Sequence, residues 1–144
     1  MKLTRILTLA LAFVMLALCA VSCGEPKVKV NVTVQIIADD PENPVLDTPI
    51  TIESTNPTVL EAVREALIVN EIAYNLTEDE SSILDIQDYK DLSATQSGDG
   101  LVYYWMYYLN DQEPQSGKAN TNTIAEGDVI KYVYSSFNPE DLKK

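Results

Sequence analysis

The residues best suited to chemistry form three groups: acidic side chains, two cysteines and a run of aromatic residues. The chain has 22 Asp and Glu against 10 Lys and Arg, and it has no histidine. The lack of histidine removes the usual general base at neutral pH and the commonest transition-metal ligand. The sequence also has no glycine-rich phosphate loop and no nucleophile elbow. These features favour a non-catalytic protein over an enzyme.

The acidic residues give a formal charge of −12, which argues against nucleic acid as a partner because phosphate backbones would be repelled. Two acidic groups, at residues 39–42 and 78–80, raise the alternative of a calcium site, since calcium binds several oxygen ligands. Neither group has the spacing of a known calcium loop. We expect solvated loop acids and no metal site.

Both cysteines lie near the N-terminus, within a segment that has the layout of a secretory signal. Lys2 and Arg5 precede an uncharged, almost entirely apolar run over residues 6–20. This run is shorter than the roughly 20 apolar residues that span a bilayer. Cleavage before Cys23 would remove Cys19, so no intramolecular disulfide is expected and the fold must depend on its hydrophobic core.

The segment Ala20-Val21-Ser22-Cys23 resembles a bacterial lipobox, in which the cysteine is diacylated; leucine is more usual at the position of Ala20. The resemblance implies a signal peptide over residues 1–22, a lipid on Cys23 and a short tether over residues 23–27. The partner would then be the membrane, and the location its extracytoplasmic face. The alternative is an ordinary small-x-small cleavage site with an incidental cysteine.

The aromatic run Leu101–Leu109 is the most apolar part of the mature chain, and its composition predicts a strand. Alternate residues of a strand face opposite ways, so the tyrosines and Trp105 divide between two faces. A single helix would cover one face and leave the other to solvent, a loop, a ligand or a partner. Loops that cover both sets would make them core, and for aromatic residues in a strand this is a commoner arrangement than a ligand platform. The candidate ligand-binding residues are Tyr103, Tyr104, Trp105, Tyr107, Tyr108, Tyr132 and Tyr134.

Other patterns predict the elements that position this strand. Apolar residues alternate strictly from Val28 to Ile36, which indicates a strand with one buried face. Asn56 as the cap and Pro57 at the first position predict a helix over residues 57–70. Weaker signals predict a strand at 49–54, a helix extension or a short extended piece at 72–76, a strand at 82–89, turns at 110–111 and 127–128, a final strand at 129–134, and a frayed tail from Ser135.

This order of elements is that of a β-grasp domain, and three motifs resemble the transcobalamin-like C-terminal domain of bacterial surface proteins. They are Pro57–Ala62, Tyr104–Asn110, and Glu126–Ile130 followed by Tyr132 and Tyr134. The resemblance covers residues 28–136 and leaves 137–144 as a tail. It implies an α+β fold, with a mixed four- to five-stranded sheet and one helix packed across one face. The family commonly has Asn-Gly where this chain has Asn110-Asp111.

The resemblance also supplies a functional hypothesis. In the eukaryotic cobalamin carriers, the similar domain forms one side of a corrinoid site and a larger helical domain supplies the other; we find no counterpart of that helical domain in this sequence. The resemblance therefore implies a cobalamin-type molecule as the ligand. We expect no resident cofactor. The alternative is a protein–protein adaptor or structural module of a cell-surface complex.

Overall fold

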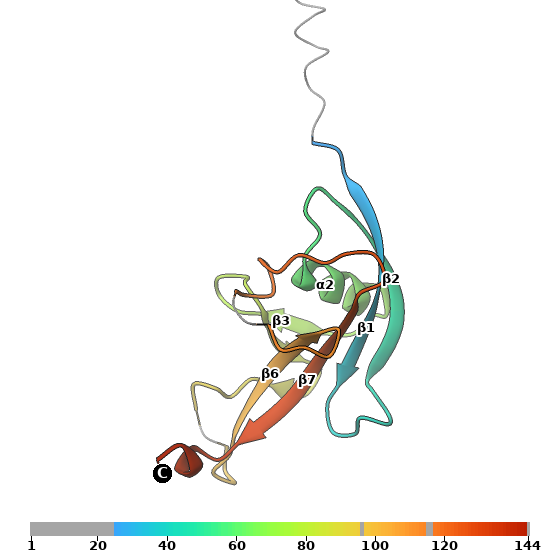
Figure 1. Ribbon diagram of the computed structural model, residues 1–144. Coiled ribbons are helices and arrows are strands. Elements are labelled where there is room, and N and C mark those ends of the chain that lie inside the picture. The colour runs from blue at the N-terminus through green and yellow to red at the C-terminus, as the bar shows by residue number, and fades with distance from the viewer. Residues whose placement is uncertain (1–24, 96, 115–116, 144) are drawn as a thin grey trace, which may run out of the picture.

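The computed structural model describes residues 25–95, 97–114 and 117–143 (Figure 1). The expected signal peptide and Cys23 lie outside these residues. No helix within the described ranges is long and apolar enough to cross a bilayer. In chain order the elements are β1 (Val28–Ile37), β2 (Leu46–Ser54), α2 (Val59–Val69), β3 (Tyr74–Leu76), β4 (Ile83–Ile86), β5 (Tyr89–Lys90), β6 (Val102–Leu109), β7 (Val129–Phe137) and the 3-10 helix η1 (Pro139–Lys143).

The main sheet has four strands in the order β2-β1-β7-β6. It is mixed, because β1 and β7 run parallel while the β1–β2 and β6–β7 pairs are antiparallel. The short strands β3, β4 and β5 form a second, separate antiparallel sheet. The expected α+β class with one helix on a mixed sheet is therefore confirmed, and the weak strand signals between residues 72 and 90 belong to the second sheet.

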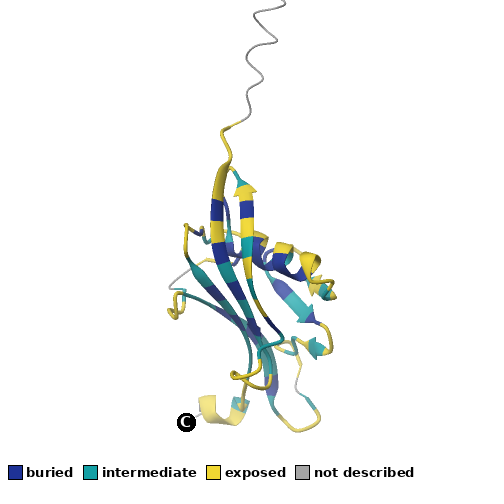
Figure 2. Cartoon of the chain, turned by 90° about the vertical axis from the view of Figure 1, so that its right-hand side faces the viewer, coloured by how far each residue is buried: buried dark blue, intermediate teal, exposed yellow. Residues whose placement is uncertain are grey.

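The alternation along β1 decides which face of the main sheet is inside. Val32, Val34 and Ile36 are buried, whereas Lys29 and Asn31 are exposed (Figure 2). Helix α2 lies behind the sheet in Figure 1 and packs on β1 and β2. Its buried side chains recur at helical spacing, as an amphipathic helix requires; they are Val59, Leu60, Ala62, Val63, Ala66 and Leu67.

The start of α2 differs from the sequence prediction. Thr58 is the N-cap, and its hydroxyl accepts a hydrogen bond from the Glu61 backbone N–H, while the Glu61 carboxylate accepts one from the Thr58 N–H. This capping box satisfies two free amides at once. Pro57 lies outside the helix, and its carbonyl oxygen accepts from Ile124 N at 3.0 Å. The cap at Asn56 was therefore wrong, because pairing of residues 57–58 with the 122–124 segment keeps Thr58 extended.

The end of β7 also differs from the prediction. Pairing of β7 with β6 continues through Ser135 and Ser136 to Phe137, opposite Val102. Asn138 then accepts a hydrogen bond from the Glu140 backbone N–H at 3.0 Å, and η1 begins at Pro139. The interpretation of this segment as a frayed tail was wrong, because the long partner strand β6 provides pairing for three more residues.

The turn after β6 is a tight two-residue hairpin. Leu109 and Gln112 exchange both backbone hydrogen bonds, and the two residues between them have left-handed backbones, with φ of 53° at Asn110 and 62° at Asp111. Asn and Asp tolerate this region better than other non-glycine residues. The Asn110 side chain also bonds to Asp128 and to Val129 N, so the hairpin is tied to the start of β7.

Candidate binding surface

The two alternating sets of aromatic residues on β6 have different surroundings. Trp105 and Tyr107 are each 8% exposed, on the same face of the sheet as the buried side of β1. They lie opposite Tyr134 and Tyr132 on β7, and Tyr132 is 1% exposed. The two tyrosines on β7 therefore extend the covered face. Helix α2 packs on the other half of the sheet, so the small sheet and neighbouring loops cover these aromatic residues.

The polar atoms of this covered set all have partners. The Trp105 Nε1–H donates to the Tyr89 carbonyl oxygen at 3.1 Å, and the Tyr134 hydroxyl donates to the Lys90 carbonyl oxygen at 2.7 Å. Asn122 donates to the Tyr107 hydroxyl at 2.6 Å, and the Tyr132 and Ser82 hydroxyls lie 3.0 Å apart. Buried Tyr and Trp residues need such partners. These contacts are those expected of a structural core.

The phenols of this set remain uncharged at neutral pH. Burial raises the pKa of Tyr132, Tyr107 and Tyr134 above the ordinary value. Tyr103, at the open end of the set, donates to the Asp99 carboxylate at 2.8 Å, and this bond raises its pKa. Tyr103 stacks on Tyr134 with ring centroids 5.5 Å apart.

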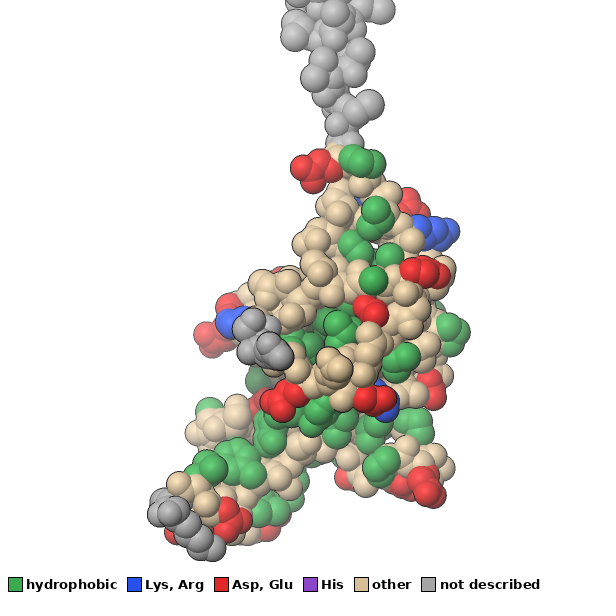
Figure 3. Space-filling model, viewed as in Figure 1, with side chains coloured by type: hydrophobic (Ala, Val, Ile, Leu, Met, Phe, Trp, Pro, Cys, Tyr) green, Lys and Arg blue, Asp and Glu red, His purple; other side chains and the backbone are tan. Residues whose placement is uncertain are grey.

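The opposite set forms a different surface. Tyr104, Met106 and Tyr108 are half-buried, and Val133 and Phe137 lie beside them on β7. Neither α2 nor the small sheet packs on this side (Figure 1). We call these five residues the open aromatic face. Figure 3 shows hydrophobic side chains gathered over the lower part of β6 and β7, toward the C-terminal end.

A pocket of about 640 Å³ lies at the C-terminal end of this face. We call it the terminal pocket; it is lined by Leu101, Tyr104, Ser136, Phe137, Asn138, Asp141 and Leu142. The Tyr104 and Phe137 rings meet edge to face with centroids 5.8 Å apart. Phe137 is 37% exposed and Leu142 76%, so apolar surface is open to contact. The volume lies within the usual range for small-molecule sites.

The β1–β2 half of the same face is polar. Asn31, Asp47 and Thr51 are exposed there. Lys131 marks the boundary, and its ammonium group pairs with Asp111 from the hairpin. The face therefore changes from hydrogen-bonding groups to aromatic and aliphatic groups across its width, which suits an amphipathic ligand.

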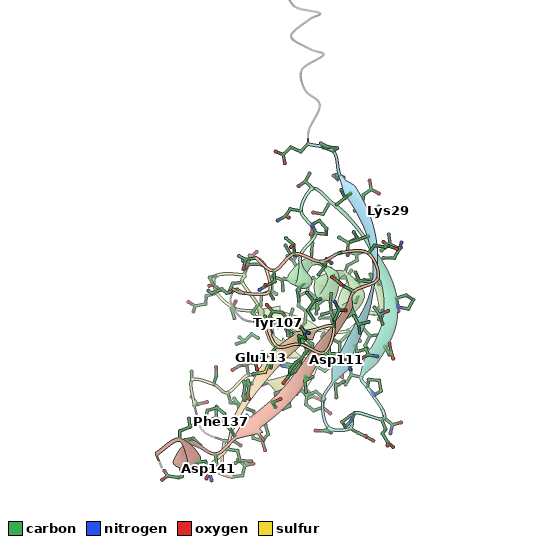
Figure 4. The ribbon with its side chains drawn as sticks, in the orientation of Figure 1. Lys29, Tyr107, Asp111, Glu113, Phe137 and Asp141 are labelled. Atoms are coloured by element: carbon green, nitrogen blue, oxygen red, sulfur yellow. The ribbon has the colours of Figure 1, made fainter. Side chains whose placement is uncertain are left out.

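A smaller hollow of about 290 Å³ adjoins the covered set at the edge of β6. Tyr107 and Glu113, labelled in Figure 4, line it together with Lys118. Lys118 forms an ion pair with Asp79, so its charge is already compensated. This hollow has less than half the volume of the terminal pocket, and the two aromatic residues that line it are buried parts of the covered set.

Several carboxylates of the acidic loops are already engaged, some within their own turns and, for Asp39 and Asp79, by Tyr89 and Lys118 from distant segments. Asp40 accepts from Glu42 N at 2.9 Å and from the Asn43 side chain at 2.7 Å, and these bonds lower its pKa. Asp79 accepts from the Ser81 and Thr77 hydroxyls and pairs with Lys118, which lowers its pKa strongly. Within the described ranges, no group of three or more acidic or cysteine side chains is placed to hold a metal ion.

The structure therefore divides the seven candidate residues. Tyr104 and Tyr108 lie on the open aromatic face, whereas Tyr103, Trp105, Tyr107, Tyr132 and Tyr134 lie on the covered face. Sequence reasoning missed Leu101, Phe137 and Leu142. One available signal was the continued alternation Val133, Ser135, Phe137, and another was Asn138-Pro139, a helix-start pair like the one considered at Asn56-Pro57.

Comparisons with known proteins identify the fold. Haptocorrin, solved in complex with Cbi, superposes with a TM-score of 0.59 at 15% identity over 76% of this chain. The likeness covers 26% of haptocorrin, so this chain spans about a quarter of its length. A protein from Ruminococcus gnavus ATCC 29149, described as a candidate metal-binding protein, matches 75% of this chain and 98% of its own with a TM-score of 0.49 and 12% identity. No protein-family model and no curated protein matches the sequence.

Proposed function

We propose that this protein is a non-catalytic lipoprotein, held by a lipid on Cys23 at the extracytoplasmic face of the membrane, which binds a small amphipathic ligand on its open aromatic face. The observation that supports it most directly is the half-exposed set of Tyr104, Met106, Tyr108 and Phe137, next to a pocket of about 640 Å³. Exposed aromatic clusters are favoured for recognition because they bury much area at small entropic cost.

The ligand class is a planar ring system with polar substituents. Aromatic rings and aliphatic side chains can pack on the flat face of such a ligand, and the polar half of the sheet offers amides and hydroxyls to its periphery. Haptocorrin, which shares the fold, was solved with the corrinoid cobinamide, and this makes a corrinoid the first ligand to test. The absence of histidine means that no imidazole can ligate cobalt here. Binding would then depend on packing, with modest affinity for one domain.

Titration with cobinamide, followed by the fluorescence of Trp105, tests the proposal. The chain has one tryptophan, so its emission reports on one position, and a corrinoid bound on the other side of β6 would quench it by energy transfer. We expect saturable quenching in the micromolar range. An unchanged spectrum at high micromolar ligand contradicts corrinoid binding.

Two variants assign the site. Tyr104→Ala removes the ring shared by the open aromatic face and the terminal pocket, and it should weaken binding about tenfold, which corresponds to roughly 1.4 kcal/mol. Glu65→Ala, an exposed change on helix α2, which lies on the other side of the sheet, is the matched control and should bind like the wild type. Equal affinities for all three proteins would place the ligand elsewhere.

The second candidate function is docking on a partner protein. It is favoured by the limited coverage of haptocorrin, since three quarters of that chain has no counterpart in this fold. Crosslinking from Tyr108→Cys in native membranes, followed by mass spectrometry, should recover one reproducible partner if this function holds. If the ligand is a small molecule, crosslinking from residue 108 on the open aromatic face should recover no reproducible partner protein.

A further inference from the structure

Residues 25–27, the described part of the tether, and the terminal pocket lie at opposite ends of the molecule. Figure 4 shows Lys29 at the end where the chain enters β1, and Phe137 with Asp141 at the other end. The topology explains this arrangement, because β7 runs parallel to β1 and continues beyond it. Ile37, the last residue of β1, pairs with Val133, and β7 extends four residues further to Phe137.

The strand lengths give the scale of this separation. From Val28 to Ile37 and then from Val133 to Phe137 the path covers 13 steps, or about 43 Å at roughly 3.3 Å per residue. Five residue steps connect Cys23 with Val28, and even a fully extended chain of that length spans at most about 18 Å. A lipid on Cys23 would therefore keep the start of β1 near the membrane, and the pocket approaches the bilayer only if the domain lies down.

The distribution of charge opposes lying down on an anionic membrane. Lys27 and Lys29 are exposed at the tether end beside Glu25 and Glu53, so this end has no net negative charge where it would meet the headgroups. Lys2 and Arg5 leave with the signal peptide, so eight basic residues face 22 acidic ones in the mature chain. Exposed carboxylates occur along both sides and at the far end, where they would be repelled by anionic lipid; they include Asp47, Glu61, Glu65, Asp99 and Asp141.

We infer that the anchored domain stands with β1 and β7 directed outward, so that the terminal pocket opens to the medium and takes its ligand from the aqueous side rather than from the bilayer. This inference rests on the proposed lipid anchor. It deepens the proposed function by assigning the source of the ligand to dissolved molecules outside the membrane.

Two variants of the lipidated mature chain, each with one introduced cysteine, test the orientation. A lipid on Cys23 blocks its thiol and cleavage removes Cys19, so an introduced cysteine can be labelled selectively. Ser136→Cys places a fluorophore at the terminal pocket, and Thr55→Cys places one in the β2–α2 loop near the tether end. Both are conservative hydroxyl-to-thiol changes at exposed residues.

The labelled proteins are placed in vesicles of phosphatidylcholine with about a quarter phosphatidylglycerol, an anionic surface, with and without a nitroxide quencher on the lipid headgroup. We expect the label at residue 55 to lose most of its fluorescence and the label at residue 136 to keep it. Equal or stronger quenching at residue 136 in vesicle-bound protein overturns the orientation and leaves the anchor standing.

Flotation of the same samples separates the two proposals. Protein that carries a diacyl group by mass spectrometry and floats with vesicles supports the anchor. The control for each variant is a chain that starts at residue 23 and carries Cys23→Ser; it has neither the apolar leader nor the lipid and should remain in solution. Absence of the lipid, or flotation that persists in this control, overturns the anchor and with it the orientation.

Discussion

Removal of single hydroxyls from Tyr132 and Tyr104 should show which face of β6 and β7 is closed. Tyr132 is 1% exposed, and its hydroxyl lies 3.0 Å from the Ser82 hydroxyl. Tyr132→Phe removes this hydrogen bond from a fully buried side chain. A net hydrogen bond contributes about 0.5–1.5 kcal/mol, and we expect a loss near the upper value, about 1.5 kcal/mol, because water cannot reach the Tyr132 position.

The matched change on the open aromatic face is Tyr104→Phe. Tyr104 is half-exposed and water can reach its surroundings, so the same loss of one oxygen should change the free energy of unfolding by less than about 0.5 kcal/mol. Urea unfolding of the mature chain, followed by Trp105 fluorescence, measures both values. At about 3–6 °C per kcal/mol for a domain of this size, the melting temperature of Tyr132→Phe should fall by roughly 5–9 °C.

The comparison of the two variants is the decisive result. A difference of about 1 kcal/mol or more, with equal denaturant dependence, supports one sealed and one accessible face. Equal losses for both variants would mean that the Tyr104 side is closed as well. The open aromatic face would then be part of the core, and the proposal of ligand binding would lose its main support.

Three further outcomes follow from the geometry. Asp111→Gly should stabilise the hairpin by about 0.5–1 kcal/mol, because glycine has no strain at the φ of 62° and an exposed ion pair contributes little; a lower urea midpoint would contradict this. Hydrogen bonds from the Asn31 backbone and side chain lower the pKa of Glu126 below its ordinary value of 4.5. The ionised Glu126 carboxylate therefore stabilises the folded state above pH 4.5, and this contribution is lost as the pH falls through the pKa that Glu126 has in the folded protein. Glu126→Gln should therefore flatten the decline of stability between neutral pH and pH 3, measured by circular dichroism, and an unchanged slope would refute the role of this bond. Pro49 lies in the edge strand β2 opposite Thr33. The Thr33 N–H donates to the Asp128 carbonyl oxygen on the other side of β1, so the backbone nitrogen of residue 49 faces the free edge of the sheet. Pro49→Thr adds a hydrogen-bond donor at that edge and should increase self-association, measured by light scattering.

Several features of the fold could be predicted from local patterns. The alternation in β1, the apolar stripe of α2 and the aromatic composition of β6 each act within one element, where side-chain direction follows from the backbone repeat. These patterns placed Tyr103, Trp105 and Tyr107 on one face and Tyr104 and Tyr108 on the other, and the register of β6 with β7 confirms that division.

Other features could not be obtained from local patterns, because they depend on partners far away in the chain. The cap at Thr58 instead of Asn56 depends on pairing with residues 122–124, and the extension of β7 to Phe137 depends on the length of β6. The separate small sheet depends on strands of two to four residues, which are too short to give a periodic signal.

The sequence by itself determined the two faces of each strand and the acidic, histidine-free chemistry, because these are properties of residue identity and backbone repeat. Which aromatic face is closed was decided by the tertiary structure. Tyr89, Lys90 and Ser82 come from segments 16 to 50 residues away and supply the acceptors that hold Trp105, Tyr134 and Tyr132 inside. The parallel pairing of β1 with β7 likewise placed the terminal pocket at the end opposite the tether. A hydrogen bond or a strand register between distant segments becomes visible when the chain has folded, since no repeat within either segment encodes it.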